Sequence, residues 1–368
     1  MSRKLNVAVV GLGIGAKHLE AYAELPDLYD VQAVCDLDAV KAKAAAAMHA
    51  DAEAFTSFSD VLAAPGLDII DICTPPNTHR SLIEQALAAG FHVICEKPIT
   101  GSLRDVDAIE KATKRAKGTL SPVFQYRFGN GLQKLKLLQE QGICGTSYLT
   151  TIETSWRRDA DYYSVPWRGK WATELGGCCL SQAIHAHDIL SYVNGPVKSA
   201  YARLATRVNP IEVEDCAAIS IEMANGSLAT LAVTLGAAEE LSRIRFMFSN
   251  LTVESRGAHP YRIGDDPWYF KGKSPEIEAR IASTLAGFKP SAESFAGQFA
   301  RIRASITGNA PLPVILADAR ASLELITAIY HSAETGTTVS LPIASDHPKY
   351  GNWIPASRRW NSESNSNG

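Results

Sequence analysis

The 368-residue sequence predicts a two-domain α/β protein. Up to about residue 124, short apolar strands alternate with helices, which is typical of a parallel sheet covered on both faces. Glycine-rich sequence directly follows the first strand and opens a helix, as in a βαβ unit. From about residue 146 the strands become longer and alternate apolar with polar residues, so we expect a large, mostly antiparallel open sheet with helices in an α+β domain.

The domain boundaries follow from these patterns and from chain length. A single core stops growing at roughly 250–300 residues, so two domains are expected. We place the first domain at 1–124, the second at 125–355 and a frayed tail at 356–368. Helical periodicity returns at 291–307 and 317–333, inside the second domain. Strands are expected at 5–10, 31–35, 68–73, 91–95 and 120–124, and then at 146–155, 197–208, 215–223, 227–235 and 243–248.

Composition excludes several classes of protein. With 36 basic and 39 acidic residues the net charge is -3, so neither nucleic acid nor an anionic membrane is an expected partner. The seven cysteines show no Cys-x-x-Cys spacing, and Cys35, Cys73 and Cys95 lie in apolar strand patterns. No apolar run reaches the roughly 18 residues of a membrane helix, and the N-terminus leads directly into a strand. We therefore expect a soluble cytoplasmic protein.

The glycine-rich turn predicts a dinucleotide site. Its pattern is Gly11-x-Gly13-x-x-Ala16, with the small Ala16 where the helix should pack on the strand and Gly15 as an additional glycine. Such turns also serve plain chain reversal, so the context decides. Here a strand precedes the turn, a helix follows it, and Asp36 ends the next strand. A carboxylate at that point accepts hydrogen bonds from the ribose hydroxyls, which predicts NAD over NADP without excluding NADP.

Polar residues follow the strands at 68–73 and 91–95. Ligands of an open α/β sheet bind beyond the carboxyl ends of its strands, so these residues are expected to share one crevice. Lys97 is followed by Pro98, which restricts its backbone and permits a cis bond, so its ammonium has a defined direction. A solvated loop lysine is the simpler alternative. The residues expected to bind the cofactor at this crevice are Thr74, Pro75, Asn77, His79, Glu96, Lys97 and, after the last strand, Gln125.

A second group of polar residues lies in a predicted helix at 176–190 that is entered through glycines. Ser181, His185 and Asp188 are spaced i, i+4 and i+7 and therefore share one face, whereas His187 points away. A zinc site from His-x-His needs both rings on one side, so we expect no metal here. Taken alone, His185 would be a histidine packed on the second sheet.

These motifs, together with His18 after the glycine turn, resemble those of the Gfo/Idh/MocA oxidoreductases, named for glucose-fructose oxidoreductase and inositol dehydrogenase. The resemblance covers nearly the whole chain. It implies a Rossmann domain, a C-terminal open sheet, bound NAD or NADP, and oxidation or reduction of sugars or cyclitols. It also implies that Lys97 and His185 are catalytic. Many members carry Asp or Asn where this chain has Ser181, which puts the proton-transfer role of His185 in question.

The expected mechanism divides the work between two side chains. Histidine, with a pKa of about 6.5, is the natural base near neutral pH, while lysine at about 10.4 is suited to polarising the substrate oxygen. Either residue could relay the proton. Aromatic and arginine side chains in the loop before the histidine helix can contact a neutral or anionic sugar. The residues expected to bind substrate are Lys97, Arg127, Trp156, Arg157, Tyr163, Trp167, Arg168, Ser181 and His185.

Two further expectations concern class and assembly. A non-catalytic, dinucleotide-binding regulator on the same fold is the main alternative to an enzyme. Reduction of an imine or enone is a further enzymatic possibility that no residue specifically favours. Ile219, Ile221 and Met223 alternate with polar residues, so one sheet face is apolar, and covering it with a second copy predicts a homo-oligomer, a dimer or tetramer.

Overall fold

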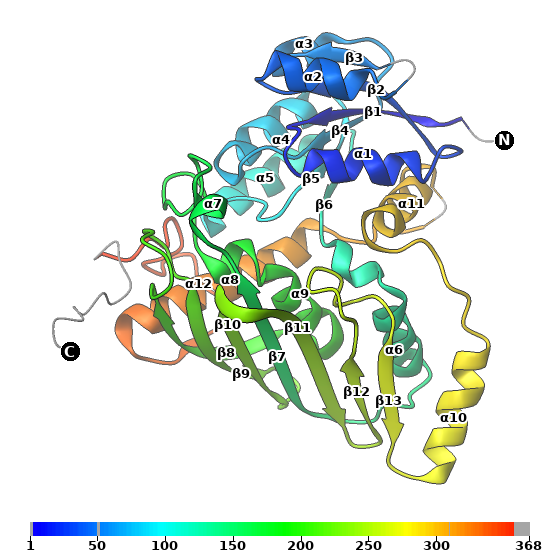
Figure 1. Cartoon of the computed structure of the whole chain (residues 1–368), viewed down its shortest axis with the longest axis vertical. Helices are drawn as coiled ribbons and strands as arrows, with labels where there is room; N and C mark the ends of the chain where they lie inside the picture. Colours follow the sequence, from blue (N-terminus) through cyan, green and yellow to red (C-terminus); the bar gives the residue numbers. More distant parts are fainter. Residues whose placement is uncertain (1–2, 50–51, 309, 357–368) are drawn as a thin grey trace. The chain divides into compact units, whose positions relative to one another are not determined.

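The computed structural model describes residues 3–49, 52–308 and 310–356, and they form two compact units (Figure 1). The first unit comprises the chain up to Gln125 together with Phe295–Arg320. The second comprises Tyr126–Ser294 and the chain from Ala321 onward. The predicted tail from residue 357 lies outside the described residues.

A six-stranded parallel sheet forms the centre of the first unit. Its order is β3-β2-β1-β4-β5-β6, which confirms the predicted Rossmann-type parallel sheet. The central strands are almost fully buried because helices cover both faces, which explains their nearly continuous apolar sequence. The elements are β1 (Leu5–Val10), α1 (Gly15–Ala23), β2 (Tyr29–Cys35), α2 (Ala39–Ala46), β3 (Glu53–Phe55), α3 (Phe58–Ala63), β4 (Ile69–Ile72), η1 (Pro76–Thr78), α4 (His79–Ala88), β5 (His92–Cys95), α5 (Leu103–Arg115) and β6 (Leu120–Pro122).

Helix α11 (Ser294–Ile306) belongs mainly to the first unit, although its sequence position suggested the second domain. Phe299 and Ile302 are buried in the core of the parallel sheet. The Tyr29 hydroxyl donates to the Phe299 carbonyl at 2.6 Å, and the Gln298 amide donates to the Pro122 carbonyl at 2.7 Å. A helical period shows which residues of α11 are apolar, but it does not show which sheet they pack against.

The second unit contains an eight-stranded sheet in the order β13-β12-β11-β7-β10-β9-β8-β14. Only the central pair of β7 and β10 is parallel among the pairings of this sheet in the described chain, so the expected mostly antiparallel sheet is confirmed. The elements are η2 (Gln125–Phe128), α6 (Asn130–Glu140), β7 (Ser147–Arg157), α7 (Ala160–Tyr163), α8 (Cys178–Ser181), α9 (Ile184–Asn194), β8 (Val197–Ala205), β9 (Cys216–Met223), β10 (Leu228–Thr234), β11 (Gly236–Phe248), β12 (Leu251–Ser255), β13 (Trp268–Gly272), α10 (Pro275–Ala286), α12 (Leu316–Thr335) and β14 (Val339–Ser340).

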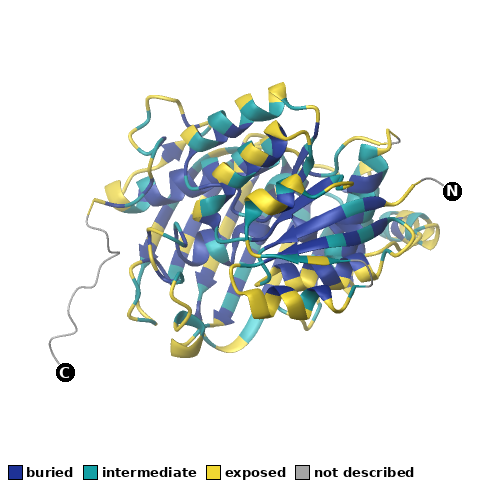
Figure 2. Cartoon of the chain, turned by 90° about the horizontal axis from the view of Figure 1, so that it is seen from above, coloured by how far each residue is buried: buried dark blue, intermediate teal, exposed yellow. Residues whose placement is uncertain are grey.

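The apolar face of this sheet is already covered by the chain itself. Ile219, Ile221 and Met223 are at most 4% exposed, and helices α8 and α9 pack against the sheet. The sequence-based prediction that a second copy covers this face is therefore wrong for Ile219, Ile221 and Met223. Figure 2 shows the strands as largely buried, with exposed residues concentrated on the helices and loops.

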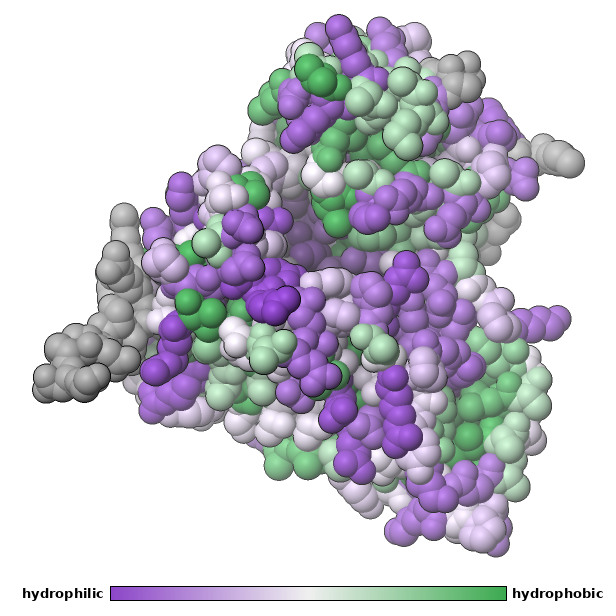
Figure 3. Space-filling model, in the orientation of Figure 1, coloured by the Kyte–Doolittle hydropathy of each residue, from purple (hydrophilic) through white to green (hydrophobic). Residues whose placement is uncertain are grey.

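Outside the sheet, helix α10 has only one buried residue, Ile281, and Figure 3 shows a hydrophobic area of the surface where this helix lies. Among the described residues, every helix is too short or too polar to span a bilayer.

Candidate functional site

The glycine turn between β1 and α1 is sterically suited to a phosphate-bearing ligand. Gly11 has φ +91°, and a Cβ there would lie 2.8 Å from the Cys73 carbonyl, so only glycine fits. A Cβ on Gly13 would meet nothing within 4 Å, which leaves the turn open on that side. With the amide groups at the start of α1, this open turn can hold a pyrophosphate.

The residue that permits the close contact between α1 and the sheet differs from the one predicted. A Cβ on Gly15 would lie 3.1 Å from Val9 Cγ1 and 3.3 Å from Cys73 Cβ, so Gly15 permits the close approach. Ala16 is exposed and does not pack there. The motif spacing alone assigned this role to Ala16, because it cannot show where the helix begins.

Asp36 lies directly after β2 and is oriented by two backbone groups. Its carboxylate accepts from the N–H of Leu12 and from that of Asp38, each at 2.9 Å. The first of these bonds fixes the carboxylate beside the glycine turn. Gln125, at the end of the first unit, is buried, and its Oε1 has no hydrogen-bond partner within the described residues. An acceptor of this kind fits a cofactor amide, so the residues present suit a dinucleotide.

The loops after β4 and β5 are joined by a buried histidine. The His79 ring lies between the carbonyls of Thr74 and Pro98, with ring nitrogens 2.8 and 2.9 Å from the two oxygens. Burial lowers the pKa of His79, although the two carbonyls oppose this shift, and the neutral ring donates to one carbonyl and contacts the other. His79 thus holds the two loops together from the inside and is no surface ligand, while Asn77 in the same segment is exposed.

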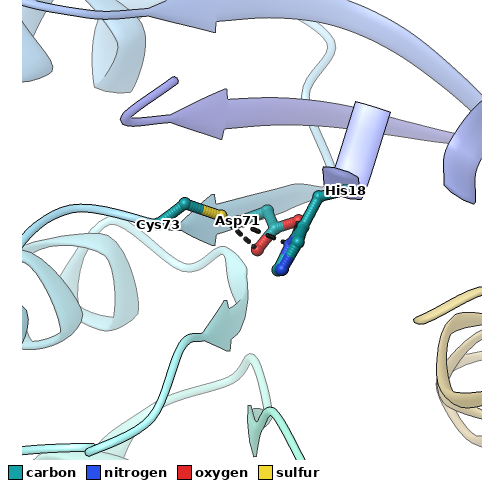
Figure 4. A group of neighbouring side chains, drawn as sticks. All are labelled: His18, Asp71 and Cys73. Carbon is teal, nitrogen blue, oxygen red and sulfur yellow. Dashed lines mark hydrogen bonds and ion pairs between the residues drawn. The ribbon is translucent and has the colours of Figure 1, made fainter. Parts of the chain in front are cut away.

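Lys97 is half-buried, and its backbone N–H donates to Glu96 Oε2 at 3.0 Å. The Lys97–Pro98 bond is cis. Glu96, which we expected to contact the cofactor, is buried and lies 3.1 Å from His18 Nε2. Figure 4 shows the other side of the His18 ring, where it points toward Asp71, with Cys73 beside them. Sequence analysis had not identified this cluster, although an acidic Asp71 inside an apolar strand was a signal for it.

In the second unit, the predicted helix at 176–190 is divided into α8 and α9. Glu214 anchors its start, because its carboxylate accepts from the N–H groups of Gly177 and Cys179 at 3.1 Å and from the Tyr330 hydroxyl at 3.0 Å. Burial raises the pKa of Glu214 to about 7, and these hydrogen bonds oppose the shift. His185 is the second residue of α9, is 4% exposed and stacks on the Tyr126 ring with centroids 4.4 Å apart.

Arg127, which we expected to bind substrate, forms a buried ion pair. Its guanidinium forms a bidentate pair with Asp188 at 2.6 and 2.7 Å, and both side chains are buried. The guanidinium also lies 4.7 Å from the centroid of the Tyr192 ring. Arg127 and Asp188 therefore connect η2 to α9, the helix that carries His185.

The loop before α8 has a buried part and a more exposed part. Trp156 is 5% exposed and donates through Nε1 to Ser242 at 2.9 Å, so it is a packing residue. Arg157 is exposed and Tyr163 half-buried. The guanidinium of Arg168 lies 4.0 Å from the ring centroid of Tyr162 and 4.4 Å from that of Trp167. The Tyr162 hydroxyl also accepts a hydrogen bond from the side-chain amide of Gln182, the residue after Ser181, at 2.9 Å.

Two groups of residues have the ligand atoms for a metal ion. In the first unit the donor atoms of His18, Asp71 and Cys73 lie within 4.8 Å of one another, as do those of Cys178, Cys179 and Glu214 in the second. Neither group was expected from sequence. In both groups the carboxylates already accept the hydrogen bonds described above.

The chain was compared with known proteins. A family model described as an oxidoreductase family with an NAD-binding Rossmann fold matches residues 5–124, and one described as a GFO/IDH/MocA C-terminal domain matches residues 132–254. D-glucoside 3-dehydrogenase of Escherichia coli is 27% identical over 92% of this chain and 98% of its own length. The uncharacterized oxidoreductase YrbE of Bacillus subtilis is 30% identical over 63% of this chain and 67% of its own length.

Solved structures resemble the chain over nearly its full length. The WlbA dehydrogenase from Bordetella pertussis, in complex with NADH and UDP-GlcNAcA, has 30% identity and a TM-score of 0.82, covering 93% of this chain and 100% of its own. Levoglucosan dehydrogenase, in complex with NADH and levoglucosan, has 21% identity and a TM-score of 0.77, covering 93% of this chain and 100% of its own, and this likeness supports the fold alone.

One prediction concerns His187, which is 1% exposed and whose ring nitrogens have no hydrogen-bond partner in the described part of the chain. Burial lowers its pKa to about 3, so between pH 6.5 and 3 the unfolded chain binds a proton that the folded chain does not. Folding stability therefore falls as the pH is lowered through this range, by roughly 2 kcal/mol from pH 7 to pH 5. His187→Leu should be more stable by about 1–3 kcal/mol at pH 7 and should lose this part of the pH dependence.

Urea unfolding of wild type and His187→Leu at pH 7 and pH 5 measures both effects. His259→Leu, at an exposed histidine, is the control. A difference between His187→Leu and wild type that stays constant between the two pH values would contradict the account.

Proposed function

This chain belongs to the Gfo/Idh/MocA family of oxidoreductases, and on that premise we propose that it is an NAD-dependent dehydrogenase of sugars, glycosides or cyclitols. The observation that carries the proposal is the connection of the Glu96–Lys97–Pro98 turn, through Glu96, to His18 on the helix that the glycine turn opens. The lysine is thereby held next to the dinucleotide-binding end of the parallel sheet. All seven cysteines are free, which supports a cytoplasmic location.

Bound NAD supplies the hydride acceptor of the reaction. The glycine turn and the start of α1 would hold its pyrophosphate, and Asp36 would accept hydrogen bonds from its ribose hydroxyls. Thr74, Pro75 and Asn77 would line the cofactor side of the loop after β4. The buried Oε1 of Gln125 would accept a hydrogen bond from an N–H group of the cofactor.

Lys97 would polarise the hydroxyl oxygen of the substrate, and His185 would accept the hydroxyl proton. The Lys97 ammonium donates a hydrogen bond to the substrate hydroxyl oxygen, and the His185 imidazole takes the hydroxyl proton as the carbon–hydrogen bond is broken. Ser181 stands where many family members carry Asp or Asn, and it can hydrogen-bond but cannot hold a carboxylate's charge. Imidazole is the side chain suited to accepting a proton near neutral pH.

The substrate class is a polyhydroxylated ring, neutral or bearing an acidic group. The stack of Arg168 with Tyr162 and Trp167 offers ring faces and donors for hydroxyls, and an arginine also admits a carboxylate. WlbA dehydrogenase, with UDP-GlcNAcA bound, is an example of a relative with an anionic sugar ligand. No specific feature of the structure favours a non-catalytic regulator.

The first test is catalytic. Lys97→Ala and His185→Ala should each lower kcat roughly a hundredfold with the best substrate, because each loses an acid–base group, while the Kd for NADH changes little, because the glycine turn and Asp36 are kept. Turnover is measured as NADH formation with a panel of sugars, sugar acids and cyclitols. Lys111→Ala and His259→Ala, at exposed positions, are the matched controls. If wild type reduces NAD with none of the panel, the proposed function is abandoned.

A second test concerns the cofactor. Asp36→Ser should weaken NAD binding and relieve the repulsion of a 2′-phosphate, so the ratio of the Kd values for NADPH and NADH should fall by roughly tenfold or more. Fluorescence titrations of wild type, Asp36→Ser and the exposed-carboxylate control Asp27→Asn give the ratio. Tighter binding of NADPH than of NADH by wild type would reject the preference.

A third test concerns assembly. With the apolar face covered, we propose that the other face of the second sheet joins two copies of the chain. Ala218, Ser220, Thr230 and Ala232 are exposed on neighbouring strands there, and small side chains permit close packing. Light scattering should show a multiple of the 39.7 kDa chain mass for wild type and a monomer for Ala232→Arg. A wild-type monomer at micromolar concentration would refute the homo-oligomer.

A further inference from the structure

The His18 ring joins helix α1 to the turn that carries Lys97. Its Nε2 lies 3.1 Å from Glu96 Oε1, and the other oxygen of Glu96 accepts the backbone N–H of Lys97 at 3.0 Å. On its other side, Nδ1 lies 2.8 Å from Asp71 Oδ2. His18 and Asp71 are fully buried and Glu96 is 4% exposed. One buried ring therefore links two carboxylates, and one of these binds the Lys97 backbone.

Two flanking carboxylates favour a charged ring. A neutral imidazole has a single N–H and can donate to only one of two carboxylates, whereas an imidazolium donates to both. Burial alone lowers the pKa of His18, but the charge of Asp71 and its hydrogen bond outweigh burial, and the pKa lies well above 6.5. Phe295 and Phe299 of α11 also contact the His18 ring, and neither side chain carries a charge. The titratable groups that face the cluster are Tyr22, Asp71, Cys73 and Glu96.

The same atoms suggest a metal ion as an alternative occupant. However, Nδ1 and Asp71 Oδ2 are joined directly by a hydrogen bond, and the opposite nitrogen of the ring faces a second carboxylate. Tyr22 also donates to Asp71 Oδ2 at 2.8 Å. A proton on each ring nitrogen satisfies all of these contacts, whereas a metal ion at Nδ1 would displace one of them.

We propose that His18 is a positioning residue for Lys97: its imidazolium holds the Glu96 carboxylate in place, and Glu96 in turn fixes the backbone of Lys97. The inference rests on the proposed function only in taking Lys97 as catalytic. His18 itself touches neither substrate nor cofactor in this account. It acts through Glu96.

The proposal predicts opposite electrostatic effects from two substitutions. His18→Asn removes a positive charge and leaves two buried carboxylates, so the surroundings of Lys97 become more negative. Glu96→Gln removes a negative charge but keeps an oxygen that can accept the Lys97 N–H. The apparent pKa of the Lys97 amine should therefore rise in His18→Asn and fall in Glu96→Gln, each by about half a unit or more. In the double variant the two changes should largely cancel.

Competitive labelling with acetic anhydride, followed by mass spectrometry across a pH series, measures this pKa without any need for turnover. Tyr22→Phe, which removes another hydrogen bond from the same cluster, is the matched control and should leave Lys97 unchanged. Lys111 serves as the internal reference in every variant. Equal Lys97 profiles in all variants, or shifts of the same sign in His18→Asn and Glu96→Gln, would overturn the proposal.

Kinetics then tests the positioning role. His18→Asn should lower kcat roughly tenfold to a hundredfold with the Kd for NADH changed less than about threefold. The double variant His18→Asn/Glu96→Gln should show a loss of kcat no larger than that of the more impaired single variant, because both substitutions act through one contact. Additive losses would overturn the role. If wild type has no turnover, the proposed function fails, while the labelling result still decides whether His18 controls Lys97.

Discussion

The first unit depends on a chain of buried charges in which the His18 ring lies between Asp71 and Glu96. These residues come from α1, from β4 and from the turn after β5, so a single ring connects three separate segments of the chain. Removing one partner of a buried ionic group typically costs about 3–5 kcal/mol, because the remaining charge is left without compensation. The cluster thus fixes the helix behind the glycine turn relative to the lysine turn, and His79 adds a second connection between the loops after β4 and β5.

The second unit uses buried polar groups in a similar way. Glu214 binds the backbone at the start of α8, and the pair of Arg127 and Asp188 ties α9 to η2. Between these anchors lie Ser181 and His185, whose positions are set from both ends. The His185 ring also packs on Tyr126, which adds a contact to the position that the anchored helix gives it.

Sequence reasoning reached the two sheets, the glycine turn and the segments around Lys97 and His185, because these depend on local patterns: apolar period, glycine at a tight approach, and polar residues after buried strands. It failed where the answer depends on what packs against what. Gly15, not Ala16, permits the close helix contact, since one residue of difference in the helix start exchanges their positions. The apolar face of Ile219 is covered from within, and α11 joins the first unit, because both depend on long-range packing. The hydrogen bonds of Arg127 to Asp188 and of Trp156 to Ser242 likewise join residues far apart in the chain, so no local pattern predicts them.

The charge on His18 is the central claim, and nitrogen NMR of the ring measures it most directly. In protein labelled with 15N-histidine, the ring nitrogens of an imidazolium are both protonated and have similar chemical shifts, whereas a neutral ring shows one protonated and one bare nitrogen. Assignment comes from the spectrum of His18→Asn. The account predicts that the imidazolium pattern of His18 persists at pH 8, well above the ordinary histidine pKa of about 6.5. A neutral pattern at that pH, or a ring nitrogen bound to a metal, would contradict it.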